Sequence, residues 1–145
     1  PNMSEDEKQQ FLEMFSGDEP VTGFVVMGGI FGEGIDLAGD QLIGAVIVSP
    51  GVPQIGLERD LIRQYYDERD HSGFFKAYLM PGFNRVMQAA GRVIRTHDDK
   101  GIVVLMDDRF NRNDYKRLFP DEWHGAGVIK DPQGLETALE GFWAV

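Results

Sequence analysis

The sequence has 145 residues, a net charge of −10, 42% apolar and 26% charged residues, and no cysteine. This length is enough for one domain with a core of its own, and the missing cysteines exclude disulfides and thiolate metal sites. No apolar run reaches the roughly 20 residues that cross a bilayer, so we expect no membrane partner. A cysteine-free composition fits the cytoplasm, with the nucleoid or nucleus as related locations.

The charges are distributed unevenly along the chain. Residues 85–117 hold eight of the fourteen basic residues but only five of the twenty-four acidic ones, which leaves a local charge of +3. The rest of the chain has 6 basic and 19 acidic residues, a balance of −13. The acidic total argues against nucleic acid, while the basic region fits either a solvated helix face or a phosphate-binding surface.

The first half of the chain predicts a helix, two strands and a second helix. Ser4 and Glu7 have the spacing of a capping box, which predicts a helix over residues 4–15. The apolar run 21–27 is typical of a buried strand, and a second strand is predicted over 45–48. Helical spacing of apolar residues then predicts a helix over 57–69.

The second half continues the alternation. Residues 74–95 form the longest helical pattern, which Pro81-Gly82 interrupts or kinks. A third strand is predicted over 102–106, short helical pieces around Tyr115, and a last helix over 133–143. Strands separated by helices indicate an α/β fold with a mostly parallel sheet flanked by helices. In such folds ligands gather at the carboxyl ends of strands, where the Gly28–Gly34, Pro50 and Asp107 loops are expected.

The loop after the first predicted strand is one of two segments that suggest chemistry. It reads Gly28-Gly29-Ile30-Phe31-Gly32-Glu33-Gly34-Ile35-Asp36. Glycines allow tight turns and the close approach of a ligand, and successive backbone N–H groups can receive phosphate oxygens. The order is neither the G-x-G-x-x-G of dinucleotide folds nor the G-x-x-x-x-G-K-[ST] of phosphate loops, so a simple structural turn is an open alternative.

The second segment reads Gln88-Ala89-Ala90-Gly91-Arg92-Val93-Ile94-Arg95. Helical spacing places Gln88, Arg92 and Arg95 on one face. The side chains expected on the opposite, buried face are Val86, Ala89, Ala90, Val93 and Ile94. Gly91 within a helix costs about 1 kcal/mol relative to alanine, which suggests close approach by a backbone or a ligand. Paired arginines suit phosphate oxygens, and salt bridges to surface acids explain them equally well.

Taken together and in this order, the two segments resemble motifs V and VI of superfamily 2 helicases, in the form of the XPD/DinG group. The matching patterns are Gly-x-Phe-x-Glu-Gly-Ile-Asp and, about fifty residues later, Gln-x-x-Gly-Arg-x-x-Arg. Further matches are Leu57-Glu58-Arg59-Asp60, Tyr65-Tyr66, Tyr78-Leu79-Met80-Pro81, Asp98-Asp99-Lys100-Gly101 and Asp107-Asp108-Arg109-Phe110. The resemblance covers roughly residues 24–118.

The resemblance implies a RecA-like P-loop NTPase fold in which residues 1–145 form a single domain, the second of two motor domains, truncated at its N-terminal edge. In that family ATP with Mg²⁺ is held mainly by the first domain, which is absent from this sequence. Any iron–sulfur cluster would also belong there. The implied partners are ATP, single-stranded DNA and that first domain, and this chain alone is expected not to hydrolyse ATP.

The resemblance also implies roles for the motif VI residues. Arg92 and Arg95 would be catalytic, as arginine fingers on the γ-phosphate, and both would bind the nucleotide. Gln88 would bind the nucleotide as well, by reading the phosphates or positioning water. We expect Arg92 and Arg95 to point into the same cleft as the glycine-rich loop.

Within the glycine-rich loop, the resemblance implies that Glu33, Gly34 and Asp36 contact the nucleotide or couple it to the arginines. Gly29 and Phe31 would lie nearer the single-stranded DNA track. No metal is expected, because the three histidines lack metal-ligand spacing. Arg109 is expected to pair with a strand-end acid and has no catalytic role.

Two other functions remain open. The chain could be a non-catalytic module that keeps the helicase fold and binds a protein partner through its acidic surface. It could also be an unrelated nucleotide-binding α/β enzyme that uses the glycine-rich loop.

Overall fold

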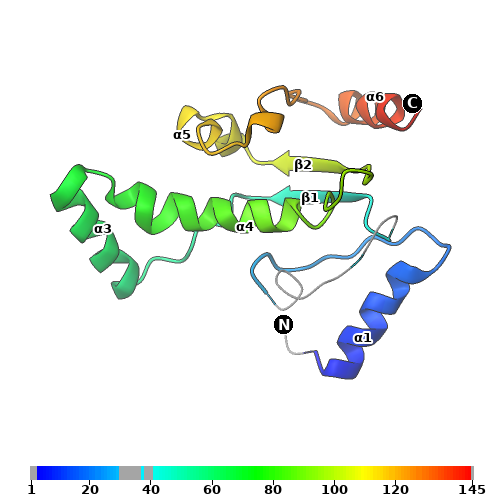
Figure 1. Cartoon of the computed structure of the whole chain (residues 1–145), viewed down its shortest axis with the longest axis horizontal. Helices are drawn as coiled ribbons and strands as arrows, with labels where there is room; N and C mark the ends of the chain where they lie inside the picture. Colours follow the sequence, from blue (N-terminus) through cyan, green and yellow to red (C-terminus); the bar gives the residue numbers. More distant parts are fainter. Residues whose placement is uncertain (1–2, 30–36, 38–40, 145) are drawn as a thin grey trace.

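The structure is a computed structural model that describes residues 3–29, 37 and 41–144 (Figure 1). In chain order its elements are α1 (Glu5–Glu13), the 3₁₀ turn η1 (Met14–Ser16), β1 (Gly44–Val48), α3 (Leu57–Asp70), the π-helix η3 (Phe75–Leu79), α4 (Met80–Ala90), β2 (Ile102–Met106), the 3₁₀ turn η4 (Asp108–Asn111), α5 (Asn113–Lys116), the 3₁₀ turn η5 (Asp121–Trp123) and α6 (Pro132–Trp143). Within these ranges no helix is long and apolar enough to cross a bilayer.

Strands β1 and β2 lie side by side and run parallel. The register pairs Gly44 with Ile102 at one end and Val48 with Met106 at the other. Both strands are rich in β-branched residues, which fit a pleated surface, and both were predicted from the sequence. Parallel pairing of strands joined through helices confirms the predicted α/β class.

The predicted strand over residues 21–27 is wrong. These residues have no strand pairing in the structure, and the side chain of Phe24 is 94% exposed. Val25 and Val26 are also largely exposed. An apolar run forms a strand only if a neighbouring strand exchanges backbone hydrogen bonds with it. Within the described ranges, β1 and β2 pair only with each other.

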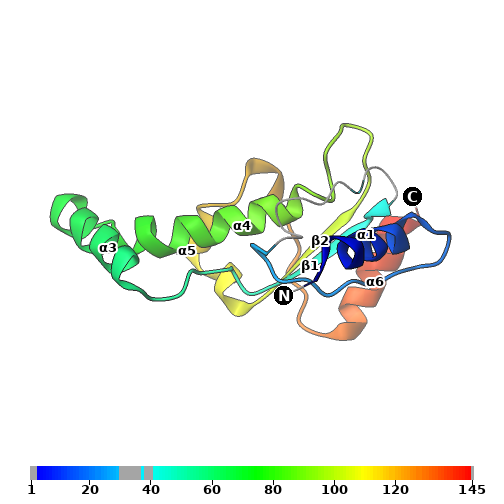
Figure 2. The same ribbon diagram turned by 90° about the horizontal axis from the view of Figure 1, so that it is seen from below.

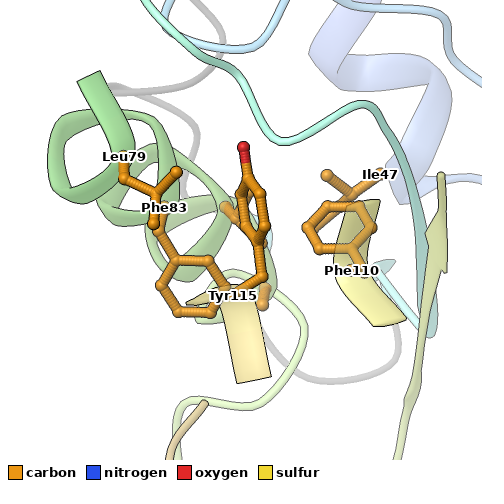
Figure 3. Close-up of a cluster of buried hydrophobic side chains, with 7 residues drawn as sticks. Ile47, Leu79, Phe83, Phe110 and Tyr115 are labelled. Atoms are coloured by element: carbon orange, nitrogen blue, oxygen red, sulfur yellow. The ribbon is translucent and has the colours of Figure 1, made fainter. Parts of the chain in front are cut away.

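The core lies between α4 and one face of the two strands (Figure 3). Its buried side chains are Ile47, Leu79, Phe83, Val86, Ala90, Phe110 and Tyr115. Strand side chains alternate between faces, so Ile47 points to α4 while Val46 and Val48 are exposed on the other side. Burying each large apolar side chain stabilises the fold by about 1.5–3 kcal/mol, so this cluster fixes α4 across the sheet.

The long helical pattern over residues 74–95 is divided into two elements. The π-helix η3 ends directly before α4, whose second residue is Pro81. Proline has no N–H and its ring clashes with the carbonyl four residues earlier, and a wider π turn relieves both problems. The predicted interruption at Pro81-Gly82 is therefore a change of helix type within continuous helical structure.

Helix α4 ends at Ala90, five residues before the predicted end. Gly91 is the C-cap, and Arg92 and Val93 donate to carbonyls only three residues back, at 3.2 and 3.0 Å. Glycine has low helix propensity. In the described structure the backbone N–H of Arg95 does not bond to a helix carbonyl, because it donates to Asp99 Oδ2 at 2.8 Å. The helix therefore gives way to a turn.

The other predicted helices are present at both ends of the chain. The capping box of α1 is formed, with Ser4 N donating to Glu7 Oε2 at 2.7 Å and Glu7 N donating to Ser4 Oγ at 3.2 Å. Figure 1 shows α1 beyond β1 and α6 beyond β2, on opposite sides of the sheet. Figure 2 shows α3 at the far end of α4, away from both strands.

Candidate functional site

The arginine segment forms a turn after α4 and is not a continuation of the helix. Gln88 lies on the last turn of α4 and is exposed, while Arg92 and Arg95 follow the helix end and are partly buried. The Nε of Arg95 donates to the carbonyl oxygen of Arg92 at 3.3 Å, so the second arginine folds back toward the first. The predicted helical face of Gln88, Arg92 and Arg95 is therefore replaced by a helix end and a turn.

Asp99 fixes this turn through its side-chain carboxylate. Its Oδ2 accepts the backbone N–H groups of Arg95 and Thr96, both at 2.8 Å. These hydrogen bonds, first from Thr96 and then from Arg95, lower the pKa of the Asp99 carboxyl. The signal was present in the Asp98-Asp99-Lys100-Gly101 turn, because aspartate often accepts nearby backbone amides.

The buried side of the segment agrees with the prediction except at Ile94. Val86, Ala90 and Val93 are buried, whereas Ile94 is 44% exposed because the chain changes direction after Ala90. Val93 packs against Gly101, where an added Cβ would lie 2.4 Å from Val93 Cγ1 and 3.1 Å from the carbonyl oxygen of Ile43. Ile43 and Gly101 directly precede β1 and β2. The arginine turn therefore lies near the amino ends of the strands.

The described start of the glycine-rich loop lies at the other end of the strands. Gly28 has φ +78°, a left-handed conformation that favours glycine, and Gly29 N donates to Val26 O at 3.0 Å. A Cβ on Gly28 would be 3.3 Å from Nε of Arg85. Gly28 and Gly29 therefore lie away from the arginine turn, against the expectation that the loop and the arginines share one cleft, while Phe31, Glu33, Gly34 and Asp36 lie outside the described residues.

Arg85 joins this loop to the loop that follows β1. Its Nη1 donates to the carbonyl oxygen of Gly51 at 3.2 Å. Gly51 has φ +61°, and a Cβ there would be 3.6 Å from Cβ of Arg85. From the sequence, Arg85 was recognised only as one of the basic residues of 85–117, although it lies three residues before Gln88 and thus on the same side of the helix.

The carboxyl ends of β1 and β2 carry a second polar cluster. Arg109 Nη2 donates to Ser49 Oγ at 3.0 Å and to Asp107 Oδ2 at 2.8 Å. Hydrogen bonds from the side chain and then the backbone of Arg109 lower the pKa of Asp107 to about 2. Ser49 follows β1 and Asp107 follows β2, so Arg109 joins the carboxyl ends of the two strands. Its guanidinium is paired with a carboxylate, which fits the expectation that Arg109 has no catalytic role.

Two parallel strands, a helix packed across one face and a Gln-x-x-Gly-Arg-x-x-Arg segment at the end of that helix define a helicase-type α/β domain. The chain matches the helicase C-terminal domain family over residues 2–126 and belongs to that family. The family's RecA-like fold agrees with the parallel α/β architecture described above.

Two helicases and an exonuclease are among the proteins similar to this chain. A probable ATP-dependent helicase of Methanocaldococcus jannaschii is 34% identical over 113 residues, 72% of this chain and 17% of the relative. The ATP-dependent DNA helicase DinG of Photobacterium profundum is 33% identical over 95 residues, 64% of this chain and 14% of that protein. A 3′-5′ exonuclease DinG of Staphylococcus saprophyticus is 43% identical over 53 residues, 36% of this chain and 6% of the relative. These relatives confirm the resemblance to the XPD/DinG group, and the chain spans less than a fifth of each.

Proposed function

We propose that this chain is the second motor domain of an ATP-dependent DNA helicase and supplies motifs V and VI to a shared ATP site. The observation that carries the proposal is the turn held by Asp99 directly after α4, which contains Arg92 and Arg95. Membership of the helicase C-terminal domain family supports it. A turn fixed by two backbone hydrogen bonds gives the arginines a defined position, as a catalytic contact requires.

Arg92 and Arg95 are the proposed arginine fingers. Guanidinium groups form charge-assisted hydrogen bonds with phosphate oxygens, so their chemistry fits the triphosphate of ATP. Such a residue neutralises charge on the transferring phosphoryl group and can raise the rate by about 10³–10⁵. Gln88, exposed one turn earlier, would bind the phosphates or orient water.

The remaining contacts belong to the glycine-rich loop and to the first domain. We propose that Glu33, Gly34 and Asp36 contact the nucleotide, and that Gly29 and Phe31 line the track of single-stranded DNA. The first domain would hold most of ATP and its Mg²⁺, whose role is to neutralise charge between the phosphates. DNA contacts in such a motor go mainly to the backbone and to stacked bases, which permits binding without sequence preference.

The test is the Arg95→Ala variant in a helicase that contains this domain together with its first domain. We expect the rate of ATP hydrolysis to fall by at least about 10³-fold, while the affinity for ATP falls much less. Arg63→Ala on α3 is the matched control, because Arg63 pairs on an exposed surface with Asp67 at 3.4 Å. Equal hydrolysis by Arg95→Ala and the unaltered protein would contradict the arginine-finger role and would favour a non-catalytic interaction module.

A further inference from the structure

Arg85 is a partly buried arginine that is held by a backbone carbonyl and has no carboxylate partner among the described residues. Arg63, Arg109 and Arg112 each form an ion pair with a carboxylate, at 3.4, 2.8 and 2.7 Å. Within residues 3–29, 37 and 41–144, Arg85 forms no ion pair, and its hydrogen-bond partner is the carbonyl oxygen of Gly51. A guanidinium has five N–H donors, so most of the hydrogen-bonding capacity of this partly buried cation remains for a ligand.

The backbone around Arg85 holds its side chain in place and leaves room for close approach. Gly28, with no Cβ, lies against its Nε, and Gly51 accepts from its Nη1. Gly82, one turn earlier on α4, packs so closely on the β1 loop that a Cβ would be 2.8 Å from the carbonyl oxygen of Pro50. The cation is therefore positioned by three chain segments at the carboxyl ends of the strands, where ligands of parallel α/β folds bind.

The position of Arg85 separates it from the proposed arginine fingers. Arg92 is seven positions after Arg85, about 10 Å along a helix axis. Val93 packs at the amino ends of the strands, whereas Gly51 follows the carboxyl end of β1, a strand roughly 16 Å long. Arg85 therefore lies at the opposite end of the strands from the turn that contains Arg92 and Arg95.

We propose that Arg85 binds a phosphodiester of single-stranded DNA. This inference rests on the proposed function, because the neighbouring Gly29 is there assigned to the DNA track. A phosphate group supplies the negative charge and the acceptor oxygens that Arg85 lacks in the described structure. Arg85 also begins the one basic region of an acidic chain, residues 85–117, where attraction for a polyanion is strongest.

The test measures binding of fluorescein-labelled oligothymidine to the 145-residue chain by fluorescence anisotropy at several KCl concentrations. Each phosphate contact on a single strand contributes about −0.7 to the slope of log K against log salt concentration. We expect Arg85→Ala to reduce the slope by about that amount and to weaken binding about tenfold. Arg85→Lys should keep the slope, and Arg63→Ala, which removes the same charge from α3, should leave slope and affinity unchanged.

The outcomes separate this inference from the proposed function. If the unaltered chain binds DNA and Arg85→Ala has the same slope, the Arg85 contact is wrong while the DNA-binding role stands. If the unaltered chain does not bind DNA, the proposed DNA contact of the domain fails, and the Arg85 contact with it. If Arg85→Ala weakens binding of an ATP analogue and not of DNA, the phosphate belongs to the nucleotide and the inference is overturned. Circular dichroism checks folding, and Arg85→Gln, which can still donate to Gly51, replaces the alanine variant if that one unfolds.

Discussion

Arg109 holds Asp107 through two parallel hydrogen bonds, from Nε to Oδ1 at 2.9 Å and from Nη2 to Oδ2 at 2.8 Å. The same guanidinium reaches Ser49 at the end of the neighbouring strand. This two-point geometry is the strong form of a carboxylate–arginine pair. It joins the carboxyl ends of β1 and β2 and confirms the expectation that Arg109 pairs with a strand-end acid.

The pair predicts a pH-dependent part of the stability. Arg109 lowers the pKa of Asp107 to about 2 from an ordinary value of 3.8, so the folded state favours the ionised carboxylate. This contribution is fully present above about pH 4 and is lost as the pH falls through about 2. Because the Arg109 side chain is 42% exposed, we expect the pair to contribute only about 1 kcal/mol to the free energy of unfolding.

Urea denaturation of Asp107→Asn and of the unaltered chain tests this value. The difference in unfolding free energy should be about 1 kcal/mol at pH 6 and should shrink toward zero near pH 2. Asp108→Asn is the control, because this neighbouring carboxyl is exposed. A difference between Asp107→Asn and the unaltered chain that is the same at both pH values would show that the pair does not titrate as expected.

Two helical glycines should respond to alanine in opposite ways. At Gly82 a Cβ would lie 2.8 Å from Pro50 O and 3.0 Å from Val52 Cα, both backbone atoms that cannot move aside easily. At Gly141 in α6 nothing lies within 4 Å of the added atom. We expect Gly82→Ala to lower the free energy of unfolding by about 1–3 kcal/mol and Gly141→Ala to raise it by up to about 1 kcal/mol.

Thermal and urea denaturation of the two variants provide the measurement. Each variant replaces a helical glycine by alanine, so the gain in helix propensity is the same in both variants. If Gly82→Ala were as stable as Gly141→Ala, the close packing of α4 on the β1 loop would be contradicted.

The sequence predicted local structure well where the signal lies within one element. Short sequence patterns predicted three such features: the capping box at Ser4, the two strands rich in Val and Ile, and the helix α3. The predictions over residues 21–27 and at the end of α4 failed because they depend on partners outside the element itself. An apolar run needs a neighbouring strand, and the helix ends where Asp99 takes the amide of Arg95.

For the candidate site, too, the sequence predicted which residues belong to a motif but not how the fold arranges them. The motif residues Gln88, Arg92 and Arg95 were found from spacing and resemblance, but their arrangement as a helix end and a turn was not. Arg85 was missed because its environment comes from Gly28 and Gly51, which are more than thirty residues away in the chain. No local pattern marks such a contact.

The capping box of α1 predicts a local effect. Ser4→Ala removes the side-chain acceptor of the Glu7 amide, and a lost N-cap costs about 0.5–2 kcal/mol of helix stability. Since α1 has no buried residue, we expect faster amide hydrogen exchange in its first turn and little change in the exchange of β1 and β2. Gln9→Ala, on the same helix but away from the cap, should leave the first turn unchanged. Equal exchange in Ser4→Ala and the unaltered chain would contradict the cap.

Asp99 should act on ATP hydrolysis as a positioning residue for Arg95, if Arg95 is an arginine finger. Asp99→Ala leaves the amides of Arg95 and Thr96 without their shared acceptor, so the turn loses its fixed geometry. A shift of about 1 Å in a catalytic group can cost on the order of 100-fold in rate. In a helicase that contains this domain and its first domain, we expect kcat for ATP hydrolysis to fall about 10–100-fold, with a smaller change in KM.

The neighbouring residue and the conservative variant make this prediction specific. Asp98 has the same charge, but its side chain is 97% exposed and contacts only the ring of His97 among the described residues, so Asp98→Ala should keep the full rate. Asp99→Asn retains an oxygen that can accept both amides and should restore most of the loss. If Asp99→Asn is as impaired as Asp99→Ala, the negative charge matters and not the position of the turn. If Asp99→Ala hydrolyses ATP at the full rate, the turn does not position Arg95 for catalysis.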